Sequence, residues 1–294
     1  MTDAAAAGAG APGAGEVAAG GIDGVSIVMP VFNQLAYTKL CLESLTRHPE
    51  GIGEIVVIDN GSSDGSGDWL QGAPGIRLIR NAENRGCAGG WNQGVAAARG
   101  EWIVVLNNDV LVTAGWIQGM LDAARELALD VVTPAIREGE ADYDLDGWAR
   151  AVTAKLGRFC RLGAADGICF MVRRRVFETV GTFDEHFRIG QFEDSDFFRR
   201  ARLAGFRLGV TGRAFLHHFG SVTQKAVRKA PSGGSAYMAE NRAYYRKKWR
   251  LTWLRRQPEK WSSRARHLAW RWRERLATGR TLKETWVEGR PRFK

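Results

Sequence analysis

The sequence predicts an α/β protein with a mainly parallel sheet, helices on both faces of that sheet, and a helical extension at the C-terminus. Short apolar runs rich in β-branched residues alternate with segments whose apolar residues recur at helical spacing. This alternation is typical of parallel sheets buried between helices. Polar clusters, such as the NND triplet at 107–109, directly follow the apolar runs. Ligands of open α/β sheets bind beyond the carboxyl ends of the strands, where these clusters would lie.

The first half of the chain contains the most regular elements. VSIVMPVF at 25–32 predicts a buried strand, and the segment after it places Leu42 and Leu45 at helical spacing. Gly100 is expected to close a later helix. In chain order, we expect strands at 25–32, 54–60, 76–81, 101–106 and near 130–134, with helices at 36–48, 89–100 and 114–128.

The pattern is less regular after residue 140. DGICFMVRRRVFETVG at 166–181 predicts a strand that runs into a helix, and 194–206 predicts a helix that stops at Gly205. RLGVTGRAFLHHFG at 207–220 predicts two short strands around a turn.

Composition divides the chain into three parts. Residues 1–22 are almost entirely Ala and Gly, and we expect a disordered leader rather than a secretory signal. Residues 23–250 form the expected α/β body, and 251–294 a basic, Trp-rich helical tail. No apolar run approaches the roughly 18 residues that span a bilayer. We therefore expect a cytoplasmic protein, peripheral at the inner face of the cell membrane if the tail binds lipid.

The net charge of +10 is concentrated in the tail. Residues 241–294 contain 18 Lys or Arg against 4 Glu, so the rest of the chain is slightly acidic. Any argument about an anionic partner therefore concerns the tail alone. The four cysteines lack the CxxC spacing of a zinc site, and buried reduced thiols are the simplest expectation; they are Cys41, Cys87, Cys160 and Cys169.

Three polar clusters are candidates for chemistry, and each also has an ordinary structural explanation. Asn107, Asn108 and Asp109 supply oxygen atoms of the kind that Mg²⁺ or Mn²⁺ binds, but Asn-Asn-Asp is also common in turns. DNGSSDGS after the second strand could hold a nucleotide base at Asp59, or simply form a turn before a helix. The acids of FEDSDFF could include a general base, or could only complement a helix N-terminus.

The order of the motifs resembles that of the inverting family 2 glycosyltransferases, which have the GT-A fold. The resemblance covers roughly residues 24–250. The amino-acid sequences of its glycine loop and NND triplet are similar to those of a rhamnosyltransferase-like branch of the family. The motifs, in order, are SIVMPVFNQ, EIVVIDNGSSDGS, NRGCAGGWNQGVAAARGEWIVVLNNDV, DGICFMVRRRVFETVGTFDEHF, FEDSDFFRRARLAGF, HHFGSVT and NRAYYRKKW.

The resemblance implies a role for each matching residue. Asp194 would be the catalytic base, and Glu193 would orient it or contact the acceptor. Asp109 would bind a Mn²⁺ or Mg²⁺ ion in the place of the family's DXD motif, with His218 as the second ligand and His217 as the alternative. The nucleotide-sugar site would include Pro30, Phe32, Asp59, Asn60, Arg85, Asn107 and Asn108.

The implied activity is transfer of a sugar from a dTDP- or UDP-linked donor to a saccharide or lipid-linked acceptor in surface polysaccharide synthesis. A different class, an anionic-surface or nucleic-acid binding protein acting through its basic tail, is weaker because the tail carries no recognisable nucleic-acid motif. A Rossmann oxidoreductase is disfavoured because the glycine loop lacks the G-x-G-x-x-G spacing.

The tail has one apolar helical face. Trp261, Ala265, Leu268, Trp272 and Leu276 recur at helical spacing, and arginines occupy the remaining positions. One interpretation is an interfacial helix on an anionic membrane. The other is a helix packed on the catalytic body or on a partner subunit.

Overall fold

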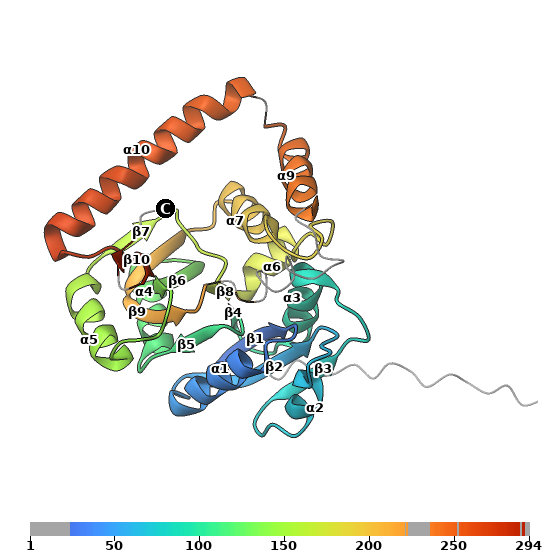
Figure 1. The fold of residues 1–294 in the computed structure, drawn as a ribbon. Coiled ribbons are helices and arrows are strands. Elements are labelled where there is room, and N and C mark those ends of the chain that lie inside the picture. The colour runs from blue at the N-terminus through green and yellow to red at the C-terminus, as the bar shows by residue number, and fades with distance from the viewer. Residues whose placement is uncertain (1–23, 221, 223–235, 252, 289, 292–294) are drawn as a thin grey trace, which may run out of the picture.

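The computed structural model describes residues 24–220, 222, 236–251, 253–288 and 290–291, and shows a mixed sheet with helices on both faces (Figure 1). The leader expected at 1–22 lies outside the described residues, as do parts of the HHFGSVT motif and of the tail. Within the described ranges, no helix combines the length and the apolar character needed to span a bilayer.

The elements alternate through the first half of the chain, as expected. The strands are β1 (Val25–Val31), β2 (Ile52–Asp59), β3 (Arg77–Arg80), β4 (Trp102–Leu106), β5 (Val110–Val112), β6 (Val131–Glu138), β7 (Cys160–Leu162), β8 (Cys169–Arg173), β9 (Leu208–His218), β10 (Lys283–Val287) and β11 (Arg290–Pro291). The helices are α1 (Leu35–Arg47), α2 (Ser66–Gln71), α3 (Gly86–Ala97), α4 (Trp116–Leu127), α5 (Leu145–Leu156), α6 (Arg174–Val180), α7 (Glu193–Leu203), α9 (Ala236–Lys248) and α10 (Trp253–Thr278).

The described strands form one sheet whose main path is β11-β10-β6-β8-β4-β1-β2-β3. Strands β4, β1, β2 and β3 run parallel, and β8 is antiparallel to both of its neighbours, β4 and β6. Strand β9 pairs in parallel with β6 and antiparallel with the short strands β5 and β7. The expected α/β fold with a mainly parallel sheet is therefore confirmed.

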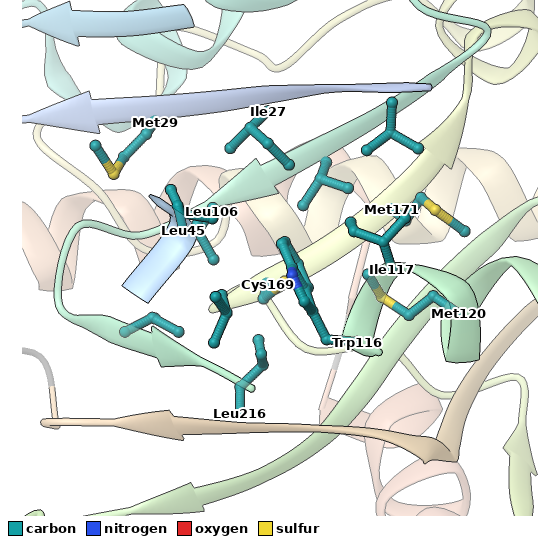
Figure 2. Close-up of a cluster of buried hydrophobic side chains, with 14 of the residues drawn as sticks. Ile27, Met29, Leu45, Leu106, Trp116, Ile117, Met120, Cys169, Met171 and Leu216 are labelled. Atoms are coloured by element: carbon teal, nitrogen blue, oxygen red, sulfur yellow. The ribbon is translucent and has the colours of Figure 1, made fainter. Parts of the chain in front are cut away.

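Strand β1 is buried because both faces of the sheet are covered. Ile27 and Met29 point into a cluster that α1 and α4 close with Leu45, Trp116 and other apolar side chains (Figure 2). Val28 points to the opposite face and joins a second cluster. Alternation along a strand sends successive side chains to opposite faces, so a strand covered on both sides needs an unbroken apolar sequence.

The second face of the sheet is covered by α3, α6 and α7. A group of aromatic rings fills this layer, among them Trp91, Phe170 and Phe197. Helix α3 approaches the sheet so closely at Gly94 that a Cβ atom there would overlap Val28 and Ile58. The glycine therefore sets the distance between helix and sheet.

The C-terminal extension returns to the sheet. Among its described residues, the tail expected to be helical over 251–294 is helical only in α10; the chain then adds β10 in parallel beside β6, because this pairing extends the sheet of the body. On β10, the ring of Trp286 lies 4.4 Å from the Arg137 guanidinium, which Tyr143 and Trp148 also contact at 3.8 and 4.3 Å. Such contacts are favourable because the negative π faces of the rings attract the guanidinium cation, and more strongly when it is removed from water.

Two local expectations were wrong. Residues 207–220 do not form two strands around a turn; β9 is one strand, and the TGRA segment is a register shift between the pairs Pro134–Thr211 and Ala135–Phe215. Pairing with β6 on both sides of the shift keeps the strand continuous, so the turn-like residues make an irregularity instead of a reversal. Helix α3 ends at Ala97 rather than at Gly100.

We predict that Gly94→Ala destabilises the protein by about 1–3 kcal/mol, because the added methyl group would overpack the contact with Val28 and Ile58. In an unconstrained helix the same change would stabilise by about 0.5–1 kcal/mol. Urea unfolding measures the difference. Gly72→Ala, with negative φ and its nearest atom 3.8 Å from the new methyl group, is the matched control and should not destabilise. Equal midpoints for Gly94→Ala and wild type would contradict this account of the helix–sheet contact.

Candidate active site

A cavity of about 360 Å³ opens at the carboxyl ends of the parallel strands. Its lining comes from segments that are far apart in the sequence. They include Cys87 and Trp91 of α3, Asn107 after β4, Glu138 of β6, Asp166–Ile168 before β8, Gln191–Ser195 at the start of α7, His218 of β9 and Lys283 of β10. Of the predicted site residues, Asn107, Glu193, Asp194 and His218 line this cavity. The other predicted residues are not part of its lining; they are Pro30, Phe32, Asp59, Asn60, Arg85, Asn108 and Asp109.

Asp109 and His218 form a buried pair. Antiparallel pairing of β5 with β9 places Val110 opposite His218, which brings the preceding carboxylate beside the imidazole. Asp109 Oδ1 lies 3.3 Å from His218 Nε2, and Asp109 Oδ2 accepts a hydrogen bond from the backbone of Val222 at 3.1 Å. Burial raises the pKa of Asp109, but the hydrogen bond and charge of His218 outweigh it, so the net pKa is lowered. The carboxylate is therefore ionised at neutral pH.

His217 faces the other side of β9. Its Nδ1 lies 2.9 Å from the Tyr143 hydroxyl, and its ring packs edge-on against Phe219. Burial, with the charges of His218 and Arg137, lowers the pKa of His217 to about 4. Strand alternation thus brings His218, rather than His217, to Asp109.

The two amides of the NND triplet point to different places. Asn107 lines the cavity. Asn108 is buried, and its Nδ2 donates a 2.9 Å hydrogen bond to Thr38 Oγ1 on α1. Asn108 therefore ties the end of β4 to α1, and its assignment to the sugar-nucleotide site stays a prediction.

The acids of FEDSDFF separate into two groups. Glu193 and Asp194 line the cavity at the N-terminus of α7. Asp196 is fully buried away from it and binds Arg200, Lys248 Nζ and Trp249 Nε1 at 2.8–2.9 Å. Asp196 thus joins α7 to the end of α9.

The loop before α7 has an unusual backbone conformation. Ile189, Gln191 and Phe192 all have φ between 64° and 78°, a region that costs non-glycine residues about 1–3 kcal/mol each. The side-chain amide of Asn241, buried on α9, donates to the carbonyls of Arg188 and Gly190 at 2.9 and 2.8 Å. These contacts hold the loop that aims Glu193 and Asp194 into the cavity.

The surroundings raise the pKa values of both cavity carboxyls. Burial, followed by the charge of Asp194, raises the pKa of Glu193 to about 8. Burial also raises the pKa of Asp194, against the opposing hydrogen bond from the Ser195 N–H at 2.6 Å. Asp194 packs against Gly167 so closely that a Cβ atom there would overlap its carboxylate. A pair of carboxyls with raised pKa values in a cavity is a common arrangement for proton transfer.

The remaining site candidates follow β1, β2 and β3. Asp59 is buried, accepts the Ser62 N–H at 3.0 Å, and lies 3.5 Å from Arg80 Nε. All polar side-chain atoms of Asn60 bond to protein groups, including the carbonyl of Gly86 and the N–H of Arg85.

The hydrogen bonds of Asn60 fix the conformation of the loop that leads into α3. Arg85 is half-exposed and pairs with Glu185 at 3.7 Å. Pro30 and Phe32 are half-buried at the end of β1. Their contact with a nucleotide stays a prediction.

Comparison with known proteins identifies the family. The family model for glycosyl transferase family 2 matches residues 26–193, more than half of the chain. The chain belongs to glycosyl transferase family 2. The matched segment carries the Asp109 triplet and ends at Glu193, and therefore spans most of the cavity lining.

Relatives of this chain have similar sequences at modest identity. The uncharacterised protein Rv1525 of Mycobacterium tuberculosis H37Rv is 30% identical over 206 residues, which cover 67% of this chain and 74% of that protein. Glycosyltransferase GlyG of Streptococcus pneumoniae serotype 4 is 28% identical over 112 residues, 37% of each chain. The uncharacterised protein y4gI of Sinorhizobium fredii is 27% identical over 68% of this chain, which spans 25% of y4gI.

Solved structures support the GT-A fold. GalNAc-T7, crystallised with UDP, GalNAc and Mn²⁺, superposes with a TM-score of 0.54 at 16% identity, over 67% of this chain and 44% of that one. Residues 1–349 of Staphylococcus aureus TarS superpose with a TM-score of 0.53 at 14% identity, over 73% and 68% of the two chains.

Sequence reasoning missed three charged residues of the cavity. Lys283 Nζ lies 2.6 Å from Asp166 and 3.8 Å from Glu138, and all three line the cavity. Burial lowers the pKa of Lys283, but Asp166 and Glu138 reverse the effect, so the lysine stays charged. No motif marks Lys283, because only the pairing of β10 with β6 brings it there.

We predict that Glu193→Gln makes the protein more stable than wild type at pH 8 by on the order of 1–3 kcal/mol, and nearly equal at about pH 5. The folded state keeps the Glu193 proton up to about pH 8, whereas the unfolded chain loses it near 4.5. The free energy of unfolding of wild type therefore falls as pH rises through this window, and Gln removes that loss.

Urea unfolding in metal-free buffer at both pH values measures the effect. Glu178→Gln, an exposed position on α6, is the matched control and should follow wild type. A pH dependence of Glu193→Gln that parallels wild type would contradict the assignment of a raised pKa to this buried acid.

Proposed function

We propose that the protein is a metal-dependent inverting glycosyltransferase of the rhamnosyltransferase-like branch. It moves a hexosyl or rhamnosyl group from a dTDP- or UDP-linked donor to a hydroxyl of a saccharide or lipid-linked acceptor in surface polysaccharide synthesis. The supporting observation is that Asp194 and His218, the partner of Asp109, line one cavity. The sequence order of the motifs and the family match add to it.

The donor side of the proposal uses the loops after β1 and β2. Asn33 links these loops through two hydrogen bonds: its backbone N–H donates to Ser62 Oγ at 2.8 Å, and its side-chain Oδ1 accepts the Ser63 N–H at 2.7 Å. Hydrogen bonds that already hold these loops in place favour nucleoside binding, because loops that must become ordered on binding reduce the affinity. UDP and Mn²⁺ in the GalNAc-T7 structure favour a diphosphate donor and a divalent ion.

A divalent ion fits the chemistry of the Asp109–His218 pair. The two side chains offer one ionised carboxylate oxygen and one imidazole nitrogen 3.3 Å apart. No third His, Cys, Asp or Glu joins them into a metal cluster among the described residues. Mg²⁺ and Mn²⁺ sites with few protein ligands take their remaining ligands from substrate phosphates and water. When bound, the ion would neutralise charge on the diphosphate leaving group.

Asp194 is the proposed general base. Its carboxylate accepts the proton of the acceptor hydroxyl while that oxygen forms a bond to the anomeric carbon. The bond from this carbon to the diphosphate oxygen breaks, and its electron pair leaves with the diphosphate. One displacement on the face opposite the leaving group inverts the anomeric configuration. Glu193, adjacent and more buried, retains its proton at neutral pH and so leaves the ionised role to Asp194.

We predict that Asp194→Asn lowers turnover by about 10²–10⁴-fold, the usual contribution of a general base. Nucleotide affinity should be unchanged, because the amide occupies the same space. A panel of nucleotide sugars with Mn²⁺ supplies the donor assay, and calorimetry with UDP or dTDP measures binding. Asp122→Asn, on α4 and away from the cavity, is the control with wild-type turnover. Near-normal turnover of Asp194→Asn would remove Asp194 from the role.

We predict that Asp109→Ala and His218→Gln each reduce the gain in nucleotide affinity that Mn²⁺ provides by at least about tenfold. His217→Gln is the matched control from the same strand, and it should keep the Mn²⁺-dependent gain because His217 faces Tyr143. Calorimetry with and without Mn²⁺ gives the affinities, after thermal unfolding shows that each variant is folded. Equal affinity with and without Mn²⁺ in wild type would rule out the metal assignment.

A further inference from the structure

Helix α10 carries a row of large apolar side chains that face solvent. Trp261, Leu268, Trp272 and Leu276 are 69%, 58%, 68% and 77% exposed, and their spacing places them on one face of the helix. They are four of the seven large hydrophobic side chains exposed among the described residues. Ala265 is also exposed on this face. The apolar row of α10 is therefore not packed on the catalytic body.

The opposite side of α10 is anchored. Glu274 is fully buried, and its two carboxylate oxygens accept hydrogen bonds from Arg161 Nη2 at 3.0 and 2.9 Å. Glu274 Oε2 also accepts the Leu282 N–H at 3.3 Å. Rotation of the helix to bury Trp272 would break this ion pair and leave a buried charge without its partner, which is strongly unfavourable. The outward direction of the apolar row is thus set by contacts on the other side.

Positive charge borders the apolar row. Helix α10 contains eight Lys or Arg and two Glu, of which Glu274 is neutralised by Arg161. At 100° per residue, Arg264 lies along one edge of the row and Arg273 along the other, and both are exposed. An apolar face with Trp and Leu between basic edges is the pattern of helices that lie in the plane of an anionic lipid surface.

We propose that α10 docks on an anionic lipid surface, with Trp261, Leu268, Trp272 and Leu276 inserted at headgroup depth and the flanking arginines on lipid phosphates. A second copy of this chain fits less well, because pairing two apolar rows would bring their basic edges together. Nucleic acid would satisfy the arginines, but Leu268 and Leu276 gain from an apolar phase and not from phosphates.

The helix is connected to the cavity over a short stretch of chain. It ends at Thr278, and Lys283, the first residue of β10, lines the cavity. Docking of α10 would therefore hold the cavity near a surface that carries lipid-linked acceptors. This last point rests on the proposed function, whereas lipid docking does not.

Co-sedimentation of the full chain with vesicles tests the proposal without any sugar donor. Vesicles of phosphatidylcholine with phosphatidylglycerol are compared with vesicles of phosphatidylcholine alone. We expect binding to the anionic vesicles that weakens with salt, and at least a tenfold loss of the partition coefficient in the double variant Leu268→Glu, Trp272→Glu. Ala277→Glu, exposed on α10 but outside the apolar row, controls for added negative charge and should lose much less.

Circular dichroism and thermal unfolding show whether each variant is folded. Equal vesicle binding by the double variant and by wild type would overturn the proposal. It would also be overturned if wild type ignored vesicles and formed a dimer that the double variant dissociates, since the occupant would then be a second copy. Binding to duplex DNA but not to anionic vesicles would assign the face to nucleic acid. Loss of sugar transfer with vesicle binding intact would affect only the proposed function.

Discussion

The antiparallel pairing of β5 with β9 is the contact on which the candidate site depends. Asp109 and His218 are more than a hundred residues apart, yet three residue pairs between these strands bring them within 3.3 Å of each other. Strand β5 is short, and β9 is held along its length by β6. The long partner thus positions the short one. Without this pairing, Asp109 would be a turn residue with no imidazole beside it.

The acid side of the cavity depends on a strained segment that the rest of the molecule holds in place. Positive φ angles at Ile189, Gln191 and Phe192 precede α7, and the amide of Asn241 satisfies carbonyl groups in the same segment. Strain at such positions persists only when surrounding contacts over-determine it. Burial then raises the pKa values of Glu193 and Asp194. The strained loop therefore places Glu193 and Asp194 where burial raises their pKa values.

One part of the C-terminal extension belongs to the central sheet, and another part, the apolar row of α10, faces solvent. Strand β10 extends the sheet, Trp286 contacts Arg137, and Lys283 brings a positive charge into an otherwise acidic cavity. The same extension presents the apolar row of α10 outward. The family model ends at residue 193, so these features belong to the part of the chain in which members of a family can differ while sharing a fold.

The sequence by itself determined the α/β class, most strands and helices of the first half, and the polar clusters that follow them. Local patterns suffice there, because β-branched runs and helical spacing report which faces are buried. Tertiary structure decided that His218 and not His217 lies beside Asp109, that Asn107 and Asn108 point in separate directions, and that β9 is a single strand. It also decided the entry of Lys283 into the cavity. Each depends on which strand lies beside which, and strand pairing is set by contacts between residues far apart in the chain, which no local pattern records.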